Sequence, residues 1–188
     1  MKTYKAQLKS ISPYSQSRHY VVDKLDKEQP GDFDRRTWRE RMHVDAKTQE
    51  VLIPPMAFKN CLSEAAKFLG IQIQGKGKST YTKHFEAGLM VLEPVMLGIK
   101  KSDVKCETLF VPASGKRGDG KRVDRTFPVI DSWNGTLTMI VIDETITADV
   151  LKEHLEQAGQ LIGVGRFRPR NNGYYGRFNV SSFKAVAA

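Results

Sequence analysis

Two segments of the chain have apolar residues at helical spacing, one near the middle and one toward the C-terminal end. Pro54 and Pro55 open the first segment and Gly70 ends it, while Thr147 can cap the second. The two apolar stripes consist of Phe58, Cys61, Leu62, Ala65, Phe68 and Leu69, and of Leu151, Leu155, Ala158 and Ile162. The fold must therefore bury two amphipathic helices against other apolar segments.

Those other segments have strand-like patterns, and they lie before, between and after the helices. In residues 3–11 apolar and polar side chains alternate, so one face can pack while the other meets water or a ligand. Further strands are predicted at residues 88–97, 104–111, 136–142 and 177–184. This order predicts an α+β fold with a ferredoxin-like (RRM-like) antiparallel sheet and two helices on one face, in a single domain of residues 1–188.

Two further segments add to this minimal pattern. Residues 12–50 are polar and highly charged, and they are predicted to form a long insertion after the first strand, broken at Pro30 and Gly31. Residues 108–130 place turn residues and five basic side chains between two strand-like stretches, which predicts a protruding basic hairpin. The open face of such a sheet and its loops are where a nucleic-acid strand can bind.

Residues 161–178 contain four arginines, four glycines and four aromatic residues, and no carboxylate. Glycine lets a backbone approach a ligand closely, arginine donates to phosphate oxygens, and aromatic rings stack on unpaired bases. At most one of Tyr174 and Tyr175 is expected at the surface, because neighbouring strand side chains point to opposite faces, and Tyr174 is taken as that residue. The predicted phosphate contacts are Arg166, Arg168, Arg170 and Arg177.

The overall charge agrees with a polyanionic partner. The chain has a formal net charge of +9 and a pI near 9.6, which favours counterion release and long-range attraction of nucleic acid. Further candidate contacts lie in the turn after the first strand, at the start of the first helix and in the hairpin. They are Ser15, Gln16 and Arg18, then Lys59, then Lys116, Arg117, Lys121 and Arg122.

Few features of the sequence point to catalysis. The histidines, at positions 19, 43, 84 and 154, are scattered and lack metal-ligand spacing, so neither a metal nor a cofactor is expected. The N-terminus lacks the apolar stretch of a secretory signal, and no apolar run is as long as a membrane span, so a cytoplasmic protein is expected. A binding protein is therefore favoured over an enzyme.

Two segments resemble the RAMP superfamily, especially the backbone subunits of CRISPR effector complexes. Residues 44–62 have an acidic residue, a turn, Ile53-Pro54 and then a helix with Lys59 near its start, and residues 163–176 are glycine-rich between the second helix and the last strand. The resemblance implies a palm that binds guide RNA, a thumb at the basic hairpin, self-association along the RNA and contacts with other effector-complex subunits. Pro55 departs from the family, which usually has glycine after Ile-Pro.

The resemblance also leaves alternatives open. In RNA-processing relatives a histidine near the first helix acts as general base, which suggests His19 or His43 as the catalytic group of a metal-independent endoribonuclease. In target-cutting relatives an aspartate of the first insertion is catalytic, and the candidates here are Asp32, Asp34 and Asp45. A phage-type mimic that interferes with such complexes is a further alternative.

Overall fold

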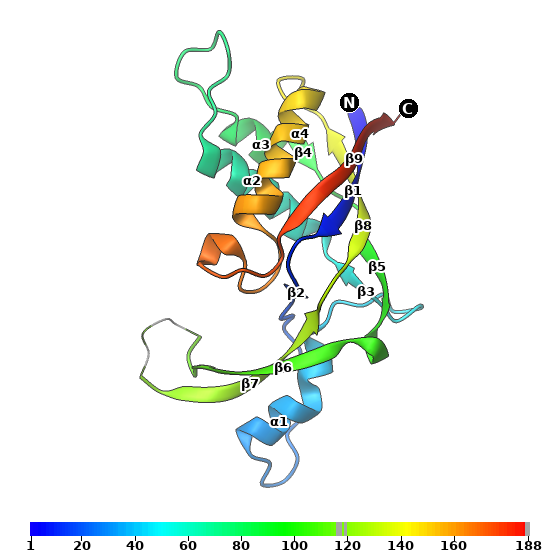
Figure 1. Cartoon of the computed structure of the whole chain (residues 1–188), viewed down its shortest axis with the longest axis vertical. Helices are drawn as coiled ribbons and strands as arrows, with labels where there is room; N and C mark the ends of the chain where they lie inside the picture. The colour runs from blue at the N-terminus through cyan, green and yellow to red at the C-terminus, as the bar shows by residue number, and fades with distance from the viewer. Residues whose placement is uncertain (116–117, 119, 187–188) are drawn as a thin grey trace.

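The computed structural model describes residues 1–115, 118 and 120–186. Its central element is an antiparallel sheet with the strand order β4-β8-β1-β9 (Figure 1). These strands are β1 (Lys2–Ser10), β4 (Leu89–Met90), β8 (Asn134–Val141) and β9 (Phe178–Val186). The predicted α+β class with antiparallel strands is therefore confirmed.

One face of this sheet forms the core. Tyr4, Ala6 and Leu8 alternate along β1 and are buried, and Ala6 lies opposite Leu137 of β8. Helices α2 (Pro55–Leu69) and α4 (Ala148–Gln157) cover the same side of the sheet (Figure 1). The ring of Phe58 from α2 packs edge-on against that of Phe178 from β9, with their centroids 5.7 Å apart.

The termini of the two helices follow their predicted signals. The Thr147 hydroxyl accepts a hydrogen bond from the Val150 amide and so caps α4, while Gly70 ends α2 in a left-handed conformation at φ 57°. Beyond α4 the chain makes one wider turn, Ala158–Ile162, before entering the glycine-rich loop. These local signals are strong because each satisfies backbone groups that a helix end leaves unpaired.

The segment between α2 and β8 differs from the prediction. A third helix, α3 (Thr82–Gly88), precedes β4, and the single strand expected at residues 88–97 is split into β4 and β5 (Val95–Lys100). Strand β5 pairs with β3 (Glu50–Ile53), which was not predicted. The split occurs because β4 joins the main sheet while β5 leaves it for a separate two-stranded ladder.

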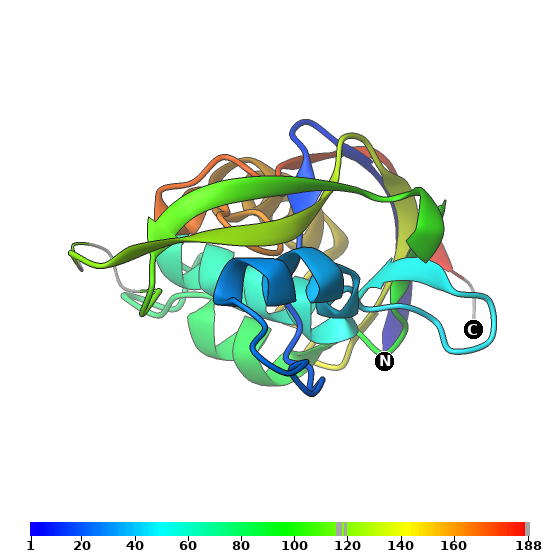
Figure 2. The same ribbon diagram turned by 90° about the horizontal axis from the view of Figure 1, so that it is seen from below.

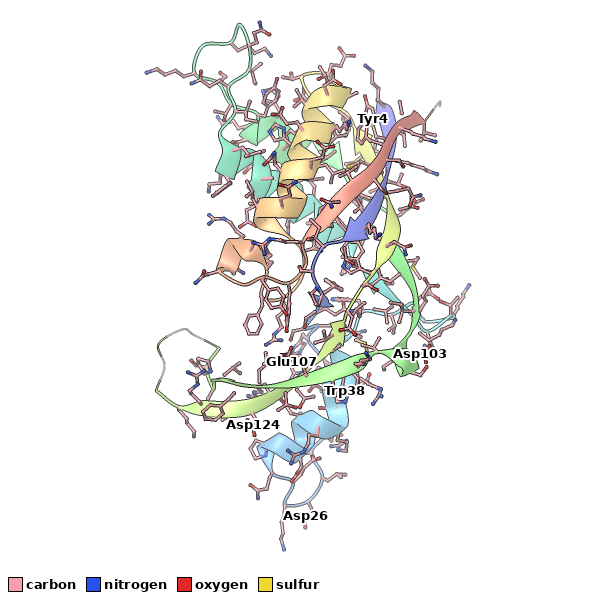
Figure 3. The ribbon with its side chains drawn as sticks, viewed as in Figure 1. Tyr4, Asp26, Trp38, Asp103, Glu107 and Asp124 are labelled. Carbon is pink, nitrogen blue, oxygen red and sulfur yellow. The ribbon has the colours of Figure 1, made fainter. Side chains whose placement is uncertain are left out.

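The first insertion contains regular structure. It holds β2 (Tyr14–Ser15), helix α1 (Pro30–Thr37) and a 3₁₀ turn, Trp38–Arg41. Pro30 was expected to break the segment, but it stands in the first turn of α1, where a missing N–H costs nothing. Trp38 is buried at the junction between the 3₁₀ turn and the hairpin (Figure 3).

Strands β6 (Lys105–Pro112) and β7 (Arg122–Ile130) form a long antiparallel hairpin. It begins three residues before the predicted range of 108–130 and ends at the same residue. The hairpin projects sideways from the main sheet, and seen from below it crosses α1 (Figures 1 and 2). Strand β2 pairs with β7, so the insertion and the hairpin form one body. Lys116 and Arg117 lie outside the described residues.

Within the described ranges, no helix has the length and apolar character needed to cross a membrane.

Candidate nucleic-acid interface

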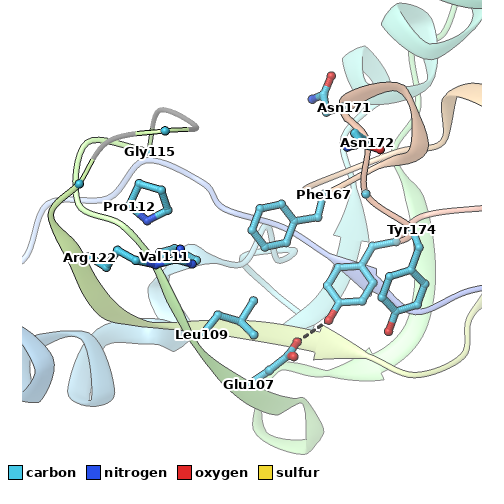
Figure 4. A pocket seen from close by; sticks show the side chains of 14 residues that line it. Glu107, Leu109, Val111, Pro112, Gly115, Arg122, Phe167, Asn171, Asn172 and Tyr174 are labelled. Carbon is cyan, nitrogen blue, oxygen red and sulfur yellow. Dashed lines mark hydrogen bonds between the residues drawn. The ribbon is translucent and has the colours of Figure 1, made fainter.

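A groove of about 970 Å³ runs between the hairpin and the glycine-rich loop (Figure 4). Alternate residues of β6 form one wall, because side chains i and i+2 of a strand share a face. Phe167 and Tyr174 line the groove on the side of the loop (Figure 4), and Tyr175 lines it as well. The described residues that line the hairpin side include Glu107, Leu109, Val111, Pro112 and Arg122.

The glycines hold the loop in its compact shape. A Cβ on Gly176, where φ is +75°, would overlap the Val164 carbonyl oxygen, and one on Gly165, where φ is +80°, would overlap the ring of Tyr14 and the carbonyl of Ser15. These glycines were expected to let the backbone approach a ligand. The structure shows instead that they let the loop pack on itself and on β2.

Arg166 is held between two aromatic rings. Its guanidinium carbon lies 3.0 Å from the ring centroid of Phe127 and 3.8 Å from that of Phe167. Its Nη1 atom is buried and has no hydrogen-bond partner among the described residues. Burial is the main cause that lowers the pKa of Arg166, to about 10. The guanidinium remains charged at neutral pH, and its plane is fixed by the rings.

The other three arginines of the loop make internal contacts. The Nη1 atom of Arg168 lies 2.8 Å from one carboxylate oxygen of Glu64, and Nε of Arg170 lies 3.4 Å from the other. Arg177 donates from Nε to the Gln160 carbonyl. The predicted phosphate contacts Arg168 and Arg170 thus already have a partner, because α2 supplies an acid that the loop sequence lacks.

The two tyrosines differ as expected. Tyr174 is 55% exposed, whereas Tyr175 is 5% exposed and its hydroxyl donates to Glu107 of β6. Burial, followed by this hydrogen bond, raises the pKa of Tyr175. Tyr175 therefore ties the loop to the hairpin, and Tyr174 has the ring that a base could contact.

The hairpin adds both charge and aromatic surface. Lys121 and Arg122 are exposed, and Arg122 donates to the Phe110 carbonyl while its guanidinium lies 5.4 Å from the Phe110 ring centroid. Phe110 itself is 60% exposed. Sequence reasoning missed Phe110 and Phe127, although the strand-like alternation of the hairpin with aromatic residues among basic ones was an available signal.

Three other predicted contact residues are engaged inside the protein. Ser15 is fully buried and donates to the Pro128 carbonyl, and Gln16 is 3% exposed with its amide oxygen accepting from the His43 amide. Lys59 donates to the carbonyls of Phe85 and Glu86 at the end of α3. These side chains are therefore not open surface donors, whereas Arg18 is exposed.

The candidate catalytic residues are dispersed. His19 is exposed, whereas His43 lies in a small cavity beside Arg166, and burial followed by the charge of Arg18 lowers its pKa. Asp34 is buried in an ion-pair network, Asp32 pairs with Arg35 at the surface, and Asp45 accepts from two backbone amides of its own turn. The described ranges contain no group of three or more potential metal ligands.

Comparison with solved structures gives the fold a context. Over 98% of its length the protein is similar to a chain of the type III-B Cmr-beta complex bound to cognate target RNA. The TM-score is 0.58, the sequence identity is 9%, and the match spans 60% of the Cmr-beta chain. It is also similar to Cmr6 from Pyrococcus furiosus, with a TM-score of 0.52, 10% identity and coverage of 95% and 97% of the two chains. No protein-family model and no curated protein sequence matches. The chain therefore shares its fold with these two structures of CRISPR subunits, which confirms the resemblance at the level of the fold.

Proposed function

We propose that this chain, which has the fold of RAMP-type CRISPR subunits, binds single-stranded RNA as a backbone subunit of a CRISPR-like ribonucleoprotein complex. In this proposal the four-stranded sheet with α2 and α4 is a ferredoxin-like palm, and the β6–β7 hairpin is the thumb. The RNA is a guide RNA, along which copies of the chain associate with one another and with other subunits.

The observation that supports the proposal best is the groove between the hairpin and the glycine-rich loop. Its walls present the exposed ring of Tyr174 and the ring of Phe167, together with the apolar side chains of Leu109 and Val111. Such a surface suits unpaired bases, since every base has a face that stacks on an aromatic ring. Arg122 lines the same groove and supplies a positive charge for the backbone phosphates.

Tyr174 provides the direct test. Replacing Tyr174→Ala removes a stacking surface, so the affinity for a labelled single-stranded RNA should fall by about 1–3 kcal/mol. Tyr174→Phe retains the ring and should bind within about twofold of the wild type, because the loss of a hydroxyl leaves stacking intact. Fluorescence anisotropy titrations at fixed salt measure both. Equal affinities for the wild type and Tyr174→Ala would remove this groove from the binding site.

A second candidate function, metal-independent cleavage of RNA, is favoured by the position of His43. This side chain lines a cavity together with Arg166, and its lowered pKa favours the neutral imidazole that a general base requires. Incubation of labelled RNA with the protein in EDTA tests it. A defined product that disappears in His43→Ala would establish cleavage, and intact RNA would leave binding as the function.

A further inference from the structure

A second, smaller cavity of about 360 Å³ lies beside Arg166, at the junction of β2, the start of α2 and the glycine-rich loop. It is distinct from the groove, but Arg166 stacks on Phe167, which lines the groove. The described side chains and backbone that line the cavity come from Tyr14, Gln16, Ser17, His43, Pro54, Ala57, Gly165 and Arg166.

Gln16 places a buried donor at this cavity. The residue is 3% exposed, and its Oε1 atom accepts from the backbone amide of His43 at 3.2 Å. Because a backbone N–H can only donate, this contact fixes the orientation of the side-chain amide. Its Nε2 group is left buried without a hydrogen-bond partner among the described residues. An unpaired buried donor is destabilising, so an acceptor at this place would be favoured.

Arg166 places a second unsatisfied donor at the same cavity. Its Nη1 atom is buried and unpaired in the described part of the chain, and no carboxylate lies among the residues that line the cavity. Its two ring neighbours hold the guanidinium plane still, so binding an anion there costs little side-chain entropy. The nearby positive charge of Arg41 adds to the burial that lowers the Arg166 pKa. Tyr175 and Glu107 oppose this lowering, but neither residue lines the cavity, so two residues with unsatisfied donors stand in a lining without negative charge.

The start of α2 adds to that potential. Pro54, which directly precedes this 15-residue helix, and Ala57 in its first turn line the cavity. Within the described ranges no side chain caps the N-terminus of the helix and no acid stands in its first turn. The N-terminal end of a helix carries a partial positive charge that favours anions. Tyr14 and Ser17, which also line the cavity, are neutral. The lining therefore offers hydrogen-bond donors and contains no negatively charged side chain.

We propose that this cavity is a phosphate site, in which Gln16 Nε2 and the Arg166 guanidinium hold the phosphate oxygens and the positive end of the α2 dipole adds to the attraction. The identification of the phosphate as part of a nucleic acid rests on the proposed function; the site itself rests on the unsatisfied donors. The phosphate is either an internal phosphodiester of the bound strand or a terminal or free phosphate.

The substitution Gln16→Glu tests the site with minimal change of shape. The new carboxylate can still accept from the His43 amide, but it replaces the unpaired donor with negative charge next to Arg166 and so occupies the place of the anion. Gln74→Glu makes the same change of charge on the exposed loop after α2 and serves as the control. Thermal unfolding and circular dichroism show whether each variant folds. If Gln16→Glu does not fold, Arg166→Met is tested in its place, because methionine retains packing between the two rings.

Two titrations then distinguish the sources of phosphate. Inorganic phosphate is titrated against chloride at equal ionic strength and followed by melting temperature, and RNA of one sequence is titrated with and without a 5′-phosphate. We expect Gln16→Glu to bind at least about tenfold more weakly than Gln74→Glu in one or both titrations. A loss seen with inorganic phosphate or with the 5′-phosphate alone identifies a terminal or free phosphate, and an equal loss for both RNAs identifies an internal phosphodiester.

The outcome that overturns the site is equal binding by Gln16→Glu and Gln74→Glu in both titrations. Failure of the proposed function looks different. If the wild type binds inorganic phosphate saturably but binds no RNA, the phosphate site stands and the RNA proposal falls. If RNA binding depends on Tyr174 and Gln16→Glu changes neither titration, the groove stands and the phosphate site falls.

Discussion

At the scale of single residues, Glu64 decides how much positive charge the glycine-rich loop presents to a ligand. Its two carboxylate oxygens face Arg168 and Arg170, so one acid on α2 neutralises much of the charge that the loop sequence alone suggests. An RNA phosphate must compete with this carboxylate for the same guanidinium groups. In the proposed complex Glu64 therefore lowers the electrostatic part of the RNA affinity, while it anchors the loop.

The substitution Glu64→Gln should accordingly strengthen RNA binding. It releases two arginines for charge-assisted contacts, and we expect the affinity for single-stranded RNA to rise by about two- to tenfold at low salt. The cost in unfolding free energy should be below about 1 kcal/mol, because these ion pairs are partly exposed. Glu156→Gln changes the net charge equally at an exposed site on α4. The same rise in both variants, measured by anisotropy, would assign the effect to overall charge.

Residue-level prediction from the sequence gave the right exposure for Tyr174 and Tyr175, although strand alternation is not the cause. Both residues lie in a loop with their ring centroids 4.5 Å apart, and Tyr175 is buried where it contacts Glu107 of the hairpin. The sequence did not indicate that Ser15, Gln16 and Lys59 make internal hydrogen bonds, because distant segments build their surroundings: β7 covers Ser15, and Lys59 reaches carbonyls of α3. A polar residue in a polar stretch shows no sign of such burial.

At the scale of elements, a single carboxylate joins helix α1 to the hairpin. Asp34 is 1% exposed, and its side chain lies 3.0 Å from a guanidinium nitrogen of Arg41 and 3.1 Å from one of Arg125 on β7. The Thr126 amide also donates to it. This network fixes α1 beneath the hairpin, and it explains why an acid proposed for catalysis is unavailable to substrate.

Replacing Asp34→Asn should therefore destabilise the protein by about 3 kcal/mol, because it leaves a largely buried arginine without its partner. The measurement is the free energy of unfolding from urea denaturation at neutral pH. Asp32→Asn removes an exposed i, i+3 pair with Arg35 on the same helix, and it should cost about 0.5 kcal/mol or less. Comparable losses in the two variants would show that the Asp34 network contributes nothing beyond a surface pair.

The sequence identified elements best where they have both a period and terminal signals. Helices α2 and α4 have apolar stripes, a proline or a capping threonine at the start, and in α2 a glycine at the end. Helix α3 has seven residues and lacks a side-chain cap, and β3 has four, so neither is long enough to show a period. These short elements form through tertiary contacts, which local sequence does not encode.

At the scale of the whole molecule, the order of helices and strands predicted the class of fold but not the position of the binding groove. The groove exists because Tyr175 from the loop meets Glu107 from the hairpin, two residues 68 positions apart in the chain. No local pattern indicates that contact. The same separation explains why the sequence predicted cationic segments one by one but not which of them act together.

The net charge of +9 is spread over the molecule, so the dependence of binding on salt can separate a defined site from general attraction. Each phosphate that a single strand gives up to a cation contributes about −0.7 to the slope of log K against log salt concentration. A strand in the groove that contacts about four cations should give a slope near −3. Arg122→Gln should then make the slope shallower by about 0.7, because this guanidinium lines the groove.

Lys78→Gln removes the same charge from the loop between α2 and α3, which lies at the end of the molecule away from the hairpin (Figure 1). Since the Debye length at 0.1 M salt is about 10 Å, a lysine outside the site should leave the slope unchanged. Anisotropy titrations at salt concentrations from about 50 to 300 mM give the slope for each variant. If both variants make the slope shallower by the same amount, RNA is attracted by the total charge of the protein, and the groove does not bind the phosphates specifically.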